Sequence, residues 1–327
     1  MSADIKQQII AMVGPDLEQV EAALEENLEP NLELVREIAS HLLFAGGKRL
    51  RPLLMIHSAR MCGYTDGFEI LFSTIFEYLH AATLLHDDVV DGADMRRGKP
   101  VAHTRWDAPK VVLTGDFLLA RALDIASKTN SPRVISVIAH ITQAMSQGEI
   151  DQMEQKGRTD LSEAEYNRII ERKTAVLIQG ACQSGAIVAG ASPEKETALK
   201  DYGYHLGMAF QMADDLLDYT ATAEELGKNP GADMREGKLT LPLIHSLANA
   251  GDKDREWILE TMAQTTFDPD RFAGLKTLLT DLGGIAYTQA RAARHVDAAK
   301  SSLALFDDSQ ARTLLTLIAD YSIQRKV

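Results

Sequence analysis

The segment that most limits how this chain can fold runs from Phe68 to His86 and is apolar on almost every side of a helix. A helix without a polar face must be enclosed by other elements. The other long segments repeat their apolar residues with the 3.6-residue period of amphipathic helices, and no run alternates as a strand would. The sequence therefore predicts an all-α fold in which residues 68–86 form the central helix of one thick bundle.

The chain carries no sign of a division into domains. Its 327 residues contain no Gly/Ser-rich or Pro-rich linker, no low-complexity tract and no repeat of roughly 20–50 residues. We therefore expect one domain over residues 1–327, with about the first 30 residues at its periphery. Ser131 and Ser192, each followed by proline, predict helix starts, as does the capping-box pair Ser162 and Glu165.

Charge limits the classes of partner. Asp and Glu number 47 against 34 Lys and Arg, which gives a formal net charge of −13. Such a surface is repelled by the phosphates of nucleic acids and by anionic membranes, so we expect no nucleic-acid partner. An anionic substrate would have to meet local basic clusters or metal ions.

The cysteines and the N-terminal segment bear on the cellular setting. Cys62 and Cys182 lie far apart without the spacing of metal ligands, which argues against a disulfide framework and a zinc site. The first residues contain no basic segment leading into an apolar one, and the apolar runs are shorter than the ~20 residues that a bilayer requires. We therefore expect a cytoplasmic protein without a transmembrane segment.

Two acidic trios share one spacing. They are Asp87, Asp88 and Asp91, at the end of the central helix, and Asp214, Asp215 and Asp218, after another apolar segment. Positions one helical turn apart point within about 40° of each other, so each trio offers two carboxylates on one side. Like charges beside apolar helices require cations, and carboxylates without nearby His or Cys select Mg²⁺ or Mn²⁺. Helix capping or surface decoration would explain one isolated trio better than two of identical spacing.

Basic residues gather in three groups. These are Lys48 with Arg51 in segment 46–52, Arg96 with Arg97 in segment 94–99, and Lys173, Lys228 and Lys238. Guanidinium and ammonium groups beside metal-binding carboxylates are what a diphosphate requires. His80 lies seven residues before Asp87, about two turns, and so shares its helical face. Solvated charges and an ordinary core histidine are the alternative readings from spacing alone.

The chain resembles the trans-polyprenyl diphosphate synthases. Six segments occur in the order found in that family: Gly-Gly-Lys-Arg-Leu-Arg-Pro from Gly46, Leu-Leu-His-Asp-Asp-Val-Val-Asp from Leu84, Asp-Met-Arg-Arg-Gly from Asp94, Glu-Arg-Lys-Thr-Ala from Glu171, Gln-Met-Ala-Asp-Asp-Leu-Leu-Asp from Gln211 and Glu-Gly-Lys-Leu-Thr-Leu-Pro from Glu236. The resemblance starts at about residue 30 and is greatest to the long-chain branch, the octaprenyl, solanesyl and decaprenyl diphosphate synthases. It implies a single large helical bundle of the isoprenoid synthase type with a central apolar cavity.

The resemblance also implies roles for individual residues. The metal ligands would be Asp87, Asp91 and Asp214, supported directly or through water by Asp88, Asp215 and Asp218. The allylic diphosphate would be held by Arg96, Lys173, Lys228 and Lys238, with Thr174 and Gln211 beside the reacting carbon C1. Isopentenyl diphosphate would be bound by Lys48, Arg51, His80 and Arg97.

The activity that the resemblance implies is a Mg²⁺-dependent prenyl transfer, with Mn²⁺ as a substitute. Metal ions and cationic side chains stabilise the departing diphosphate, the allylic C–O bond ionises, and the double bond of isopentenyl diphosphate attacks C1. Loss of a proton leaves an allylic diphosphate one C5 unit longer. The implied primer is an allylic diphosphate such as farnesyl diphosphate, the implied assembly is a homodimer, and the implied use of a long chain is a quinone side chain.

One position departs from the family pattern. Ala232, in the segment Gly231–Met234, stands where long-chain relatives often carry another aspartate. Because Asp233 is retained and Ala232 matches no assigned ligand, we expect little effect on function.

Small residues on the central helix predict a long product. Ala82 and Thr83 lie about one turn before Asp87, where family members that stop at C15 or C20 often carry an aromatic ring. Without a ring there, the growing chain would reach C40–C50 and stop at a deeper floor. That floor would be formed by Leu79, Phe76 or Ile75, or by the helix that contains Ile138, Ile141 and Met145. The alternative reading is that Ala82 is small because a neighbouring helix packs against it.

Three other functions stay open. The first is a shorter-chain prenyl diphosphate synthase with C15–C25 products. A terpene cyclase would bind one diphosphate and would not need the second basic group of Lys48, Arg51 and Arg97. A non-catalytic partner subunit would show broken acidic motifs, and both trios are intact.

Overall fold

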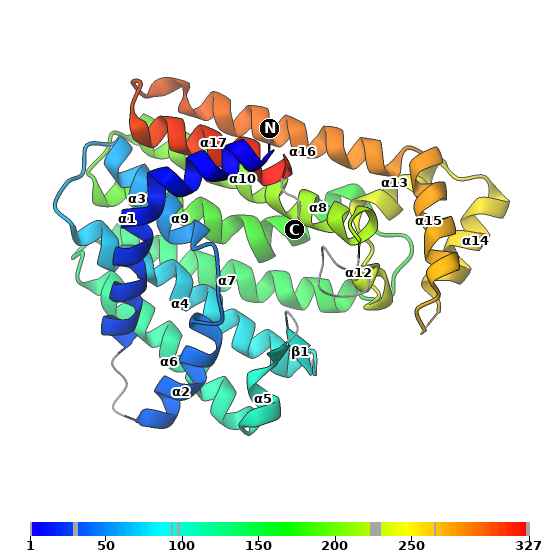
Figure 1. Ribbon diagram of the computed structural model, residues 1–327, viewed down its shortest axis with the longest axis horizontal. Helices are drawn as coiled ribbons and strands as arrows, with labels where there is room; N and C mark the ends of the chain where they lie inside the picture. Colours follow the sequence, from blue (N-terminus) through cyan, green and yellow to red (C-terminus); the bar gives the residue numbers. More distant parts are fainter. Residues whose placement is uncertain are drawn as a thin grey trace.

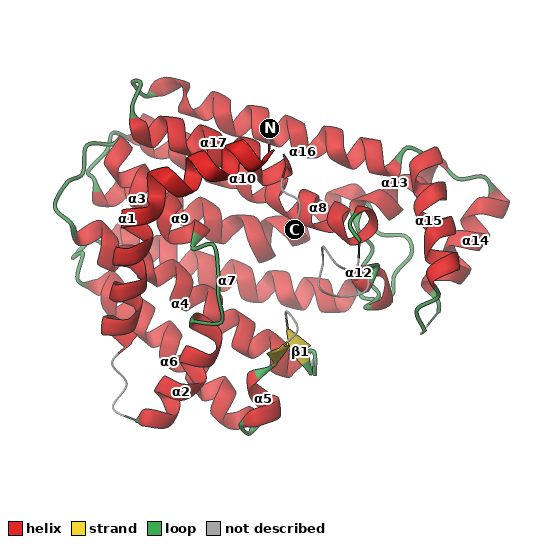
Figure 2. Ribbon diagram, viewed as in Figure 1, coloured by secondary structure: helices red, strands yellow, loops and turns green. Residues whose placement is uncertain are grey.

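The computed structural model describes residues 2–28, 32–92, 94–96, 99–222, 230–264 and 266–324, and most of them lie in helices (Figures 1 and 2). The first half of the chain forms α1 (Ser2–Leu28), α2 (Glu33–Leu43), α3 (Leu50–Met61), α4 (Phe68–Val90), α5 (Ala102–Arg105), α6 (Ala108–Ser127) and α7 (Pro132–Gln155). The second half forms α8 (Glu163–Ile170), the π-helical turn η1 (Glu171–Ala175), α9 (Val176–Val188), α10 (Pro193–Thr220), α12 (Ala232–Arg235), α13 (Leu241–Asn249), α14 (Asp252–Met262), α15 (Pro269–Asp281), α16 (Gly284–Ser302), the 3₁₀ turn η2 (Leu303–Leu305) and α17 (Gln310–Gln324). The predicted all-α class is confirmed.

A small hairpin is the feature that the sequence did not predict. The strands β1 (Met95–Arg96) and β2 (Lys99–Pro100) pair antiparallel after α4, and Figure 2 shows them as a minor element among helices. Each strand has two residues, too few for the alternating pattern by which strands are recognised.

The predicted central helix is α4. Its Phe72, Ile75 and Phe76 are fully buried, and the helix contacts α1, α2, α3, α6 and α9. In Figure 1 the long helices α4, α7, α9 and α10 run side by side across the molecule, with α14 and α15 at its right end. α4 is long and apolar enough to cross a membrane by composition, contrary to our expectation, but 67% of its most apolar window is buried inside the protein, as in a core helix.

The N-terminal helix is less peripheral than its position in the sequence led us to expect. Val20, Leu24 and Leu28 of α1 are buried in the same core cluster as α4. The Tyr78 hydroxyl of α4 donates to the Leu24 carbonyl at 2.8 Å, which ties the two helices together. The C-terminal half of α1 therefore belongs to the core.

The predicted helix starts are found at the three serines. Ser162 and Glu165 form the capping box, and Ser192 accepts a hydrogen bond from the Lys195 backbone N–H. Ser131 occupies the N-cap position of α7, but its side chain makes no capping hydrogen bond. The proline that follows Ser131 fixes the first helical φ and lacks an N–H that would need a cap.

Candidate active site

The first acidic trio lies where α4 ends. Asp87 and Asp88 occupy its last turn and Asp91 is the C-cap residue, whose N–H donates to the Asp87 carbonyl at 2.8 Å. Asp91 is exposed, Asp87 is half-buried and Asp88 is buried. The three carboxylates therefore face different surroundings.

Asp88 is bound to an arginine. Nε and Nη2 of Arg96 each lie 2.8 Å from Asp88 Oδ1, so strand β1 folds back over the end of α4. A buried carboxylate that pairs with a guanidinium fixes the position of that guanidinium. Asp88 thus holds Arg96 beside the trio. From there Arg96 could contact a diphosphate bound near Asp87 and Asp91.

Asp87 lies in a strongly acidic environment. Burial raises its pKa to about 6, together with the nearby carboxylates of Glu149 and Asp91, while Lys173 and Arg96 act in the opposite direction. Glu149 was not identified from the sequence. It lies on α7, far along the chain, and the signal that could have drawn attention to it is the mid-helix glycine that precedes it.

Gly148 allows α7 to touch the π turn η1. A Cβ at Gly148 would lie 2.8 Å from the Lys173 backbone nitrogen, too close for any side chain. The contact places the Lys173 ammonium 2.5 Å from Glu149 Oε2 and 2.6 Å from Gln152 Oε1. Single π turns occur often at functional sites, and here the turn carries Lys173 and Thr174.

The second trio lies on α10 and is largely engaged with the protein itself. Asp214 is exposed, whereas Asp215 is buried. Asp215 accepts from the Tyr166 hydroxyl at 2.6 Å and from Gln211 Nε2 at 2.8 Å, and Gln211 Oε1 accepts from the Thr174 hydroxyl at 2.8 Å. Burial, followed by the charge of Asp233, raises the pKa of Asp215. A hydrogen-bonded chain therefore joins α8, η1 and α10 at the side chains expected beside C1.

Asp218 caps the short helix α12. Its carboxylate accepts from the N–H groups of Ala232 at 3.1 Å and Asp233 at 3.0 Å. Ala232 therefore contributes through its backbone, which any residue except proline could supply. The cap holds the segment that leads to Lys238 against the second trio.

Lys238 connects the two trios electrostatically. Its ammonium lies 2.6 Å from Glu236 Oε2 and 3.9 Å from Asp233 Oδ1. Burial works against its charge, but Glu236, Asp233 and Asp91 outweigh burial and raise the pKa of Lys238. Asp91 belongs to the first trio, and the backbone of Asp233 is held by Asp218 of the second. The ammonium of Lys238 is therefore influenced by negative charge at both trios.

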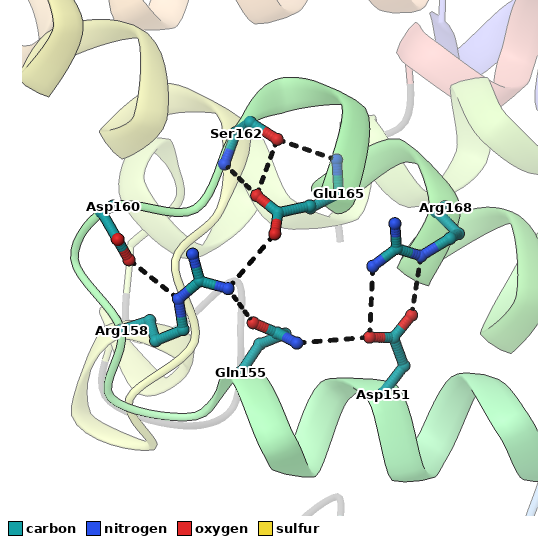
Figure 3. A network of polar contacts seen from close by, with 7 residues as sticks. All are labelled: Asp151, Gln155, Arg158, Asp160, Ser162, Glu165 and Arg168. Atoms are coloured by element: carbon teal, nitrogen blue, oxygen red, sulfur yellow. Dashed lines mark hydrogen bonds and ion pairs between the residues drawn. The ribbon is translucent and has the colours of Figure 1, made fainter.

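The polar network in Figure 3 fixes the loop between α7 and α8 beside this site. Arg168 Nε donates to Asp151 at 2.9 Å, two residues along α7 from Glu149. Arg158 lies 3.2 Å from Glu165, the capping-box residue of α8. The network holds α8 against α7, and α8 leads directly into η1.

The basic group at residues 46–52 lies at the start of α3 and in the loop before it. Lys48 is exposed before α3 begins, with its ammonium 5.8 Å from the centroid of the Tyr321 ring of α17. Arg51 lies in the first turn of α3, and His80 lies on α4 two turns before Asp87. Arg97 and Lys228, the other two basic residues assigned to the site, lie outside the described residues.

The residues expected to set product length lie within the core. Ala82, Leu79 and Phe76 are buried, and the Thr83 hydroxyl donates to the His80 carbonyl at 2.9 Å.

Among the described residues, no three His, Cys, Asp or Glu side chains converge on one metal position. Both observations leave the metal and product-length assignments as predictions.

Known proteins resemble this chain along nearly its whole length. The profile of the polyprenyl synthetase family matches residues 32–278. An octaprenyl diphosphate synthase of Escherichia coli is 35% identical over 319 residues, 98% of each chain, and a geranylgeranyl diphosphate synthase of Methanosarcina mazei is 36% identical over 313 residues, 94% of this chain and 95% of the relative. A crystal structure of a polyprenyl synthase from Caulobacter crescentus, complexed with calcium and isoprenyl diphosphate, superposes with a TM-score of 0.91 at 37% identity and 98% coverage of both chains. The chain therefore belongs to the polyprenyl synthetase family and is a prenyltransferase, a trans-prenyl diphosphate synthase.

Proposed function

We propose that the protein extends an allylic diphosphate such as farnesyl diphosphate with successive isopentenyl diphosphate units to an all-trans product of C40–C50. The observation that carries this proposal is the pairing of two acidic trios, linked by Lys238, with a second basic group at the start of α3. One diphosphate would need only the first of these arrangements. Two arrangements suit a reaction between two diphosphate substrates.

The residues present fit a divalent cation. Asp87, Asp91 and Glu149 supply oxygen donors, and burial together with the charges of Glu149 and Asp91 raises the pKa of Asp87, a condition that a bound cation would relieve. Mg²⁺ usually takes one or two carboxylates and completes its shell with water and substrate phosphates. Mg²⁺ would be held by Asp87, Asp91 and Asp214, and it would supply positive charge opposite the departing diphosphate. Asp88, Asp215 and Asp218 would support these ligands, since each already accepts hydrogen bonds from the protein.

The chain's own cations would bind the allylic diphosphate. Arg96, fixed by Asp88, and Lys173, fixed by Gln152 and Glu149, are prearranged beside Asp87. Prearranged charges stabilise a departing anion without a reorganisation cost at the moment of reaction. Gln211 and Thr174, held by Asp215, would direct their dipoles at the allylic carbon. Lys48, Arg51 and His80 would bind isopentenyl diphosphate.

The length of the product is the finer part of the proposal. Ala82, one turn before Asp87, leaves no ring across the start of a path along α4. The family relatives support a range, because an octaprenyl and a geranylgeranyl synthase are about equally similar to this chain. A shorter C15–C25 product is therefore the second candidate. The intact trios and the basic group at residues 46–52 weigh against a terpene cyclase and a non-catalytic subunit.

We also propose that the protein is a homodimer. Leu113 of α6 and Ile150 of α7 are 66% and 61% exposed, and Leu123, Ile135 and Met153 on the same two helices are also exposed. Burial of such residues against a second copy would remove apolar surface from water. Light scattering should give about twice 35.9 kDa for the wild type and 35.9 kDa for Leu113→Glu combined with Ile150→Glu. Leu305→Glu, a charge at another exposed leucine, on η2, should leave the mass of the wild type unchanged.

A cytoplasmic location and a role in supplying a quinone side chain are part of the same proposal. The acidic surface and the enclosure of α4 by other helices support a protein that works in aqueous solution.

The deciding experiment is a product analysis. The purified protein is incubated with radiolabelled isopentenyl diphosphate, farnesyl diphosphate and Mg²⁺, and the dephosphorylated products are separated by reversed-phase chromatography. C40–C50 alcohols would support the proposal, C15–C25 alcohols would favour the second candidate, and cyclic hydrocarbons or no product would contradict both.

A further inference from the structure

Arg49, the middle residue of the segment Gly46–Pro52, is buried rather than directed at solvent. Arg49 is 5% exposed, whereas its neighbour Lys48 is exposed. Arg49 has a φ of +45°, a conformation that side chains other than glycine rarely adopt. A non-glycine residue is held in this region only when its surroundings determine it, and such residues are concentrated at functional sites.

Three helices supply the partners of Arg49. Its Nε and Nη2 lie 2.6 and 3.0 Å from the two carboxylate oxygens of Glu21 on α1. Nη1 lies 3.1 Å from Glu77 Oε2 on α4, and Nη2 also donates to the Leu43 carbonyl of α2 at 2.7 Å. A buried guanidinium with two carboxylates and a carbonyl has a set of partners that lysine cannot reproduce, because lysine lacks the planar fork.

Gly47, two residues before Arg49, lies beside its guanidinium. A Cβ at Gly47 would lie 3.4 Å from Arg49 Nη1, so the bare backbone passes directly over the guanidinium. Gly46 has a φ of +101° and continues the sharp path of the loop. The loop that presents Lys48 is thus shaped around the buried Arg49 side chain.

Of the partners of Arg49, Glu77 on α4 bears most directly on function. Glu77 lies three residues before His80 and so on the same side of α4, the helix that carries Asp87 in its last turn. We propose that Arg49 is a positioning residue. It sets the distance from the cationic segment that carries Lys48 and Arg51 to the face of α4 that carries His80. This inference rests on the proposed function, in which these three residues bind isopentenyl diphosphate.

The same bundle contains a second arginine with two carboxylate partners, half-buried and away from the site. Arg60, in the last turn of α3, lies 2.7 Å from Asp16 on α1 and 3.2 Å from Glu69 on α4. Both arginines therefore join α1, α3 and α4 through two carboxylates. Arg60 lies at the far end of α3 from Lys48, so it separates a loss of helix packing from a loss of loop position.

The test compares Arg49→Lys, Glu77→Gln and Arg60→Lys in the full-length protein. Steady-state rates with both substrates varied give separate KM values, and thermal unfolding gives each Tm. Arg49→Lys should raise the KM for isopentenyl diphosphate about tenfold and change the KM for farnesyl diphosphate less than twofold. Glu77→Gln, which keeps the side-chain shape, should raise the first KM about threefold. Arg60→Lys should lower the Tm and leave both KM values within twofold of the wild type.

Two outcomes would overturn the inference. One is an unchanged KM for isopentenyl diphosphate in both Arg49→Lys and Glu77→Gln; the other is an equal rise of both KM values, or the same rise in Arg60→Lys. If Arg49→Lys does not fold, Glu77→Gln decides alone. A wild-type protein that consumes no isopentenyl diphosphate would instead refute the proposed function, and the inference with it.

Discussion

The Lys173 ammonium lies 2.5 Å from Glu149 Oε2, and both side chains influence the ionisation of Asp87 in opposite directions. Glu149 therefore serves two neighbours: it holds a cation expected to bind diphosphate, and it raises the pKa of a carboxylate expected to bind metal. The pair makes the protonation of Asp87 sensitive to metal, to pH and to a residue more than 60 positions away in the chain.

Stability without metal should depend on pH through Asp87. Burial and Glu149 raise its pKa from 3.8 to about 6, so the folded protein binds the proton more tightly than the unfolded chain. The stability that this proton contributes is present at low pH and is lost as pH rises through about 6. In EDTA, the Tm of Asp87→Asn minus that of the wild type should therefore increase between pH 5 and pH 8.

Two variants control this measurement. Glu149→Gln removes the charge that helps to raise the pKa of Asp87, so the effect of Asp87→Asn in that background should be smaller. Asp107→Asn removes an exposed carboxylate whose pKa is lowered by Lys110 and which is ionised throughout the range, so its Tm difference should stay constant. A constant difference for Asp87→Asn as well would contradict the environment described for Asp87.

Removal of an expected metal ligand should abolish turnover without unfolding the protein. Asp87→Ala, Asp91→Ala and Asp214→Ala should each lower kcat by about a hundredfold or more, because the lost interaction is strongest in the ionising transition state. Asp107→Ala is the exposed control. Circular dichroism checks the fold, and more than about a tenth of wild-type activity in all three variants, ~1.4 kcal/mol of barrier, would rule out the metal assignment.

The two diphosphate sites should separate kinetically. Lys48→Ala should raise mainly the KM for isopentenyl diphosphate, whereas Lys238→Ala, in the field of both trios, should raise mainly the KM for the allylic substrate. Initial rates with one substrate saturating give each value. Equal effects of both changes on both substrates would contradict the assignment of these lysines to two different diphosphate sites.

Product length should respond to Ala82. Ala82→Tyr places a ring about one turn from Asp87, so products should shorten to C15–C20 while the first condensation survives. Ala82→Ser, which remains small, should keep the product of the wild type. Chromatography of the labelled products distinguishes the two, and full-length products from a folded Ala82→Tyr protein would show that the chain does not grow past Ala82.

The sequence predicted the helical class, the central helix and the capping box at Ser162, because each depends on residues close together in the chain. It could not predict which member of a trio faces which partner. Asp215 meets Tyr166 only after α8 packs against α10, and Asp88 and Asp218 meet Arg96 and the α12 backbone only where the chain after each helix folds back. Spacing along one helix fixes the directions of side chains but not what lies opposite them.

Glu149 and Arg49 were missed for related reasons. Glu149 is one acid among many on an amphipathic helix, and its closeness to Asp87 depends on the contact between α7 and η1. Arg49 stands in a basic run whose other members were assigned to a substrate, and its partners Glu21 and Glu77 each lie 28 positions away. No local pattern distinguishes an arginine that faces inward from one that faces solvent.

The π turn η1 lies inside the continuous helix from Glu163 to Val188 and changes the direction in which the side chains after it point relative to those before it. Successive residues of an α-helix are rotated by about 100°, so one additional residue within a turn rotates everything beyond it by roughly that angle. Deleting a single residue of η1 would leave both aspartate motifs and the composition intact, yet it would turn either Lys173 or the buried side of α9 away from its neighbours. In this stretch the number of residues, as much as their identity, decides which side chains face the site.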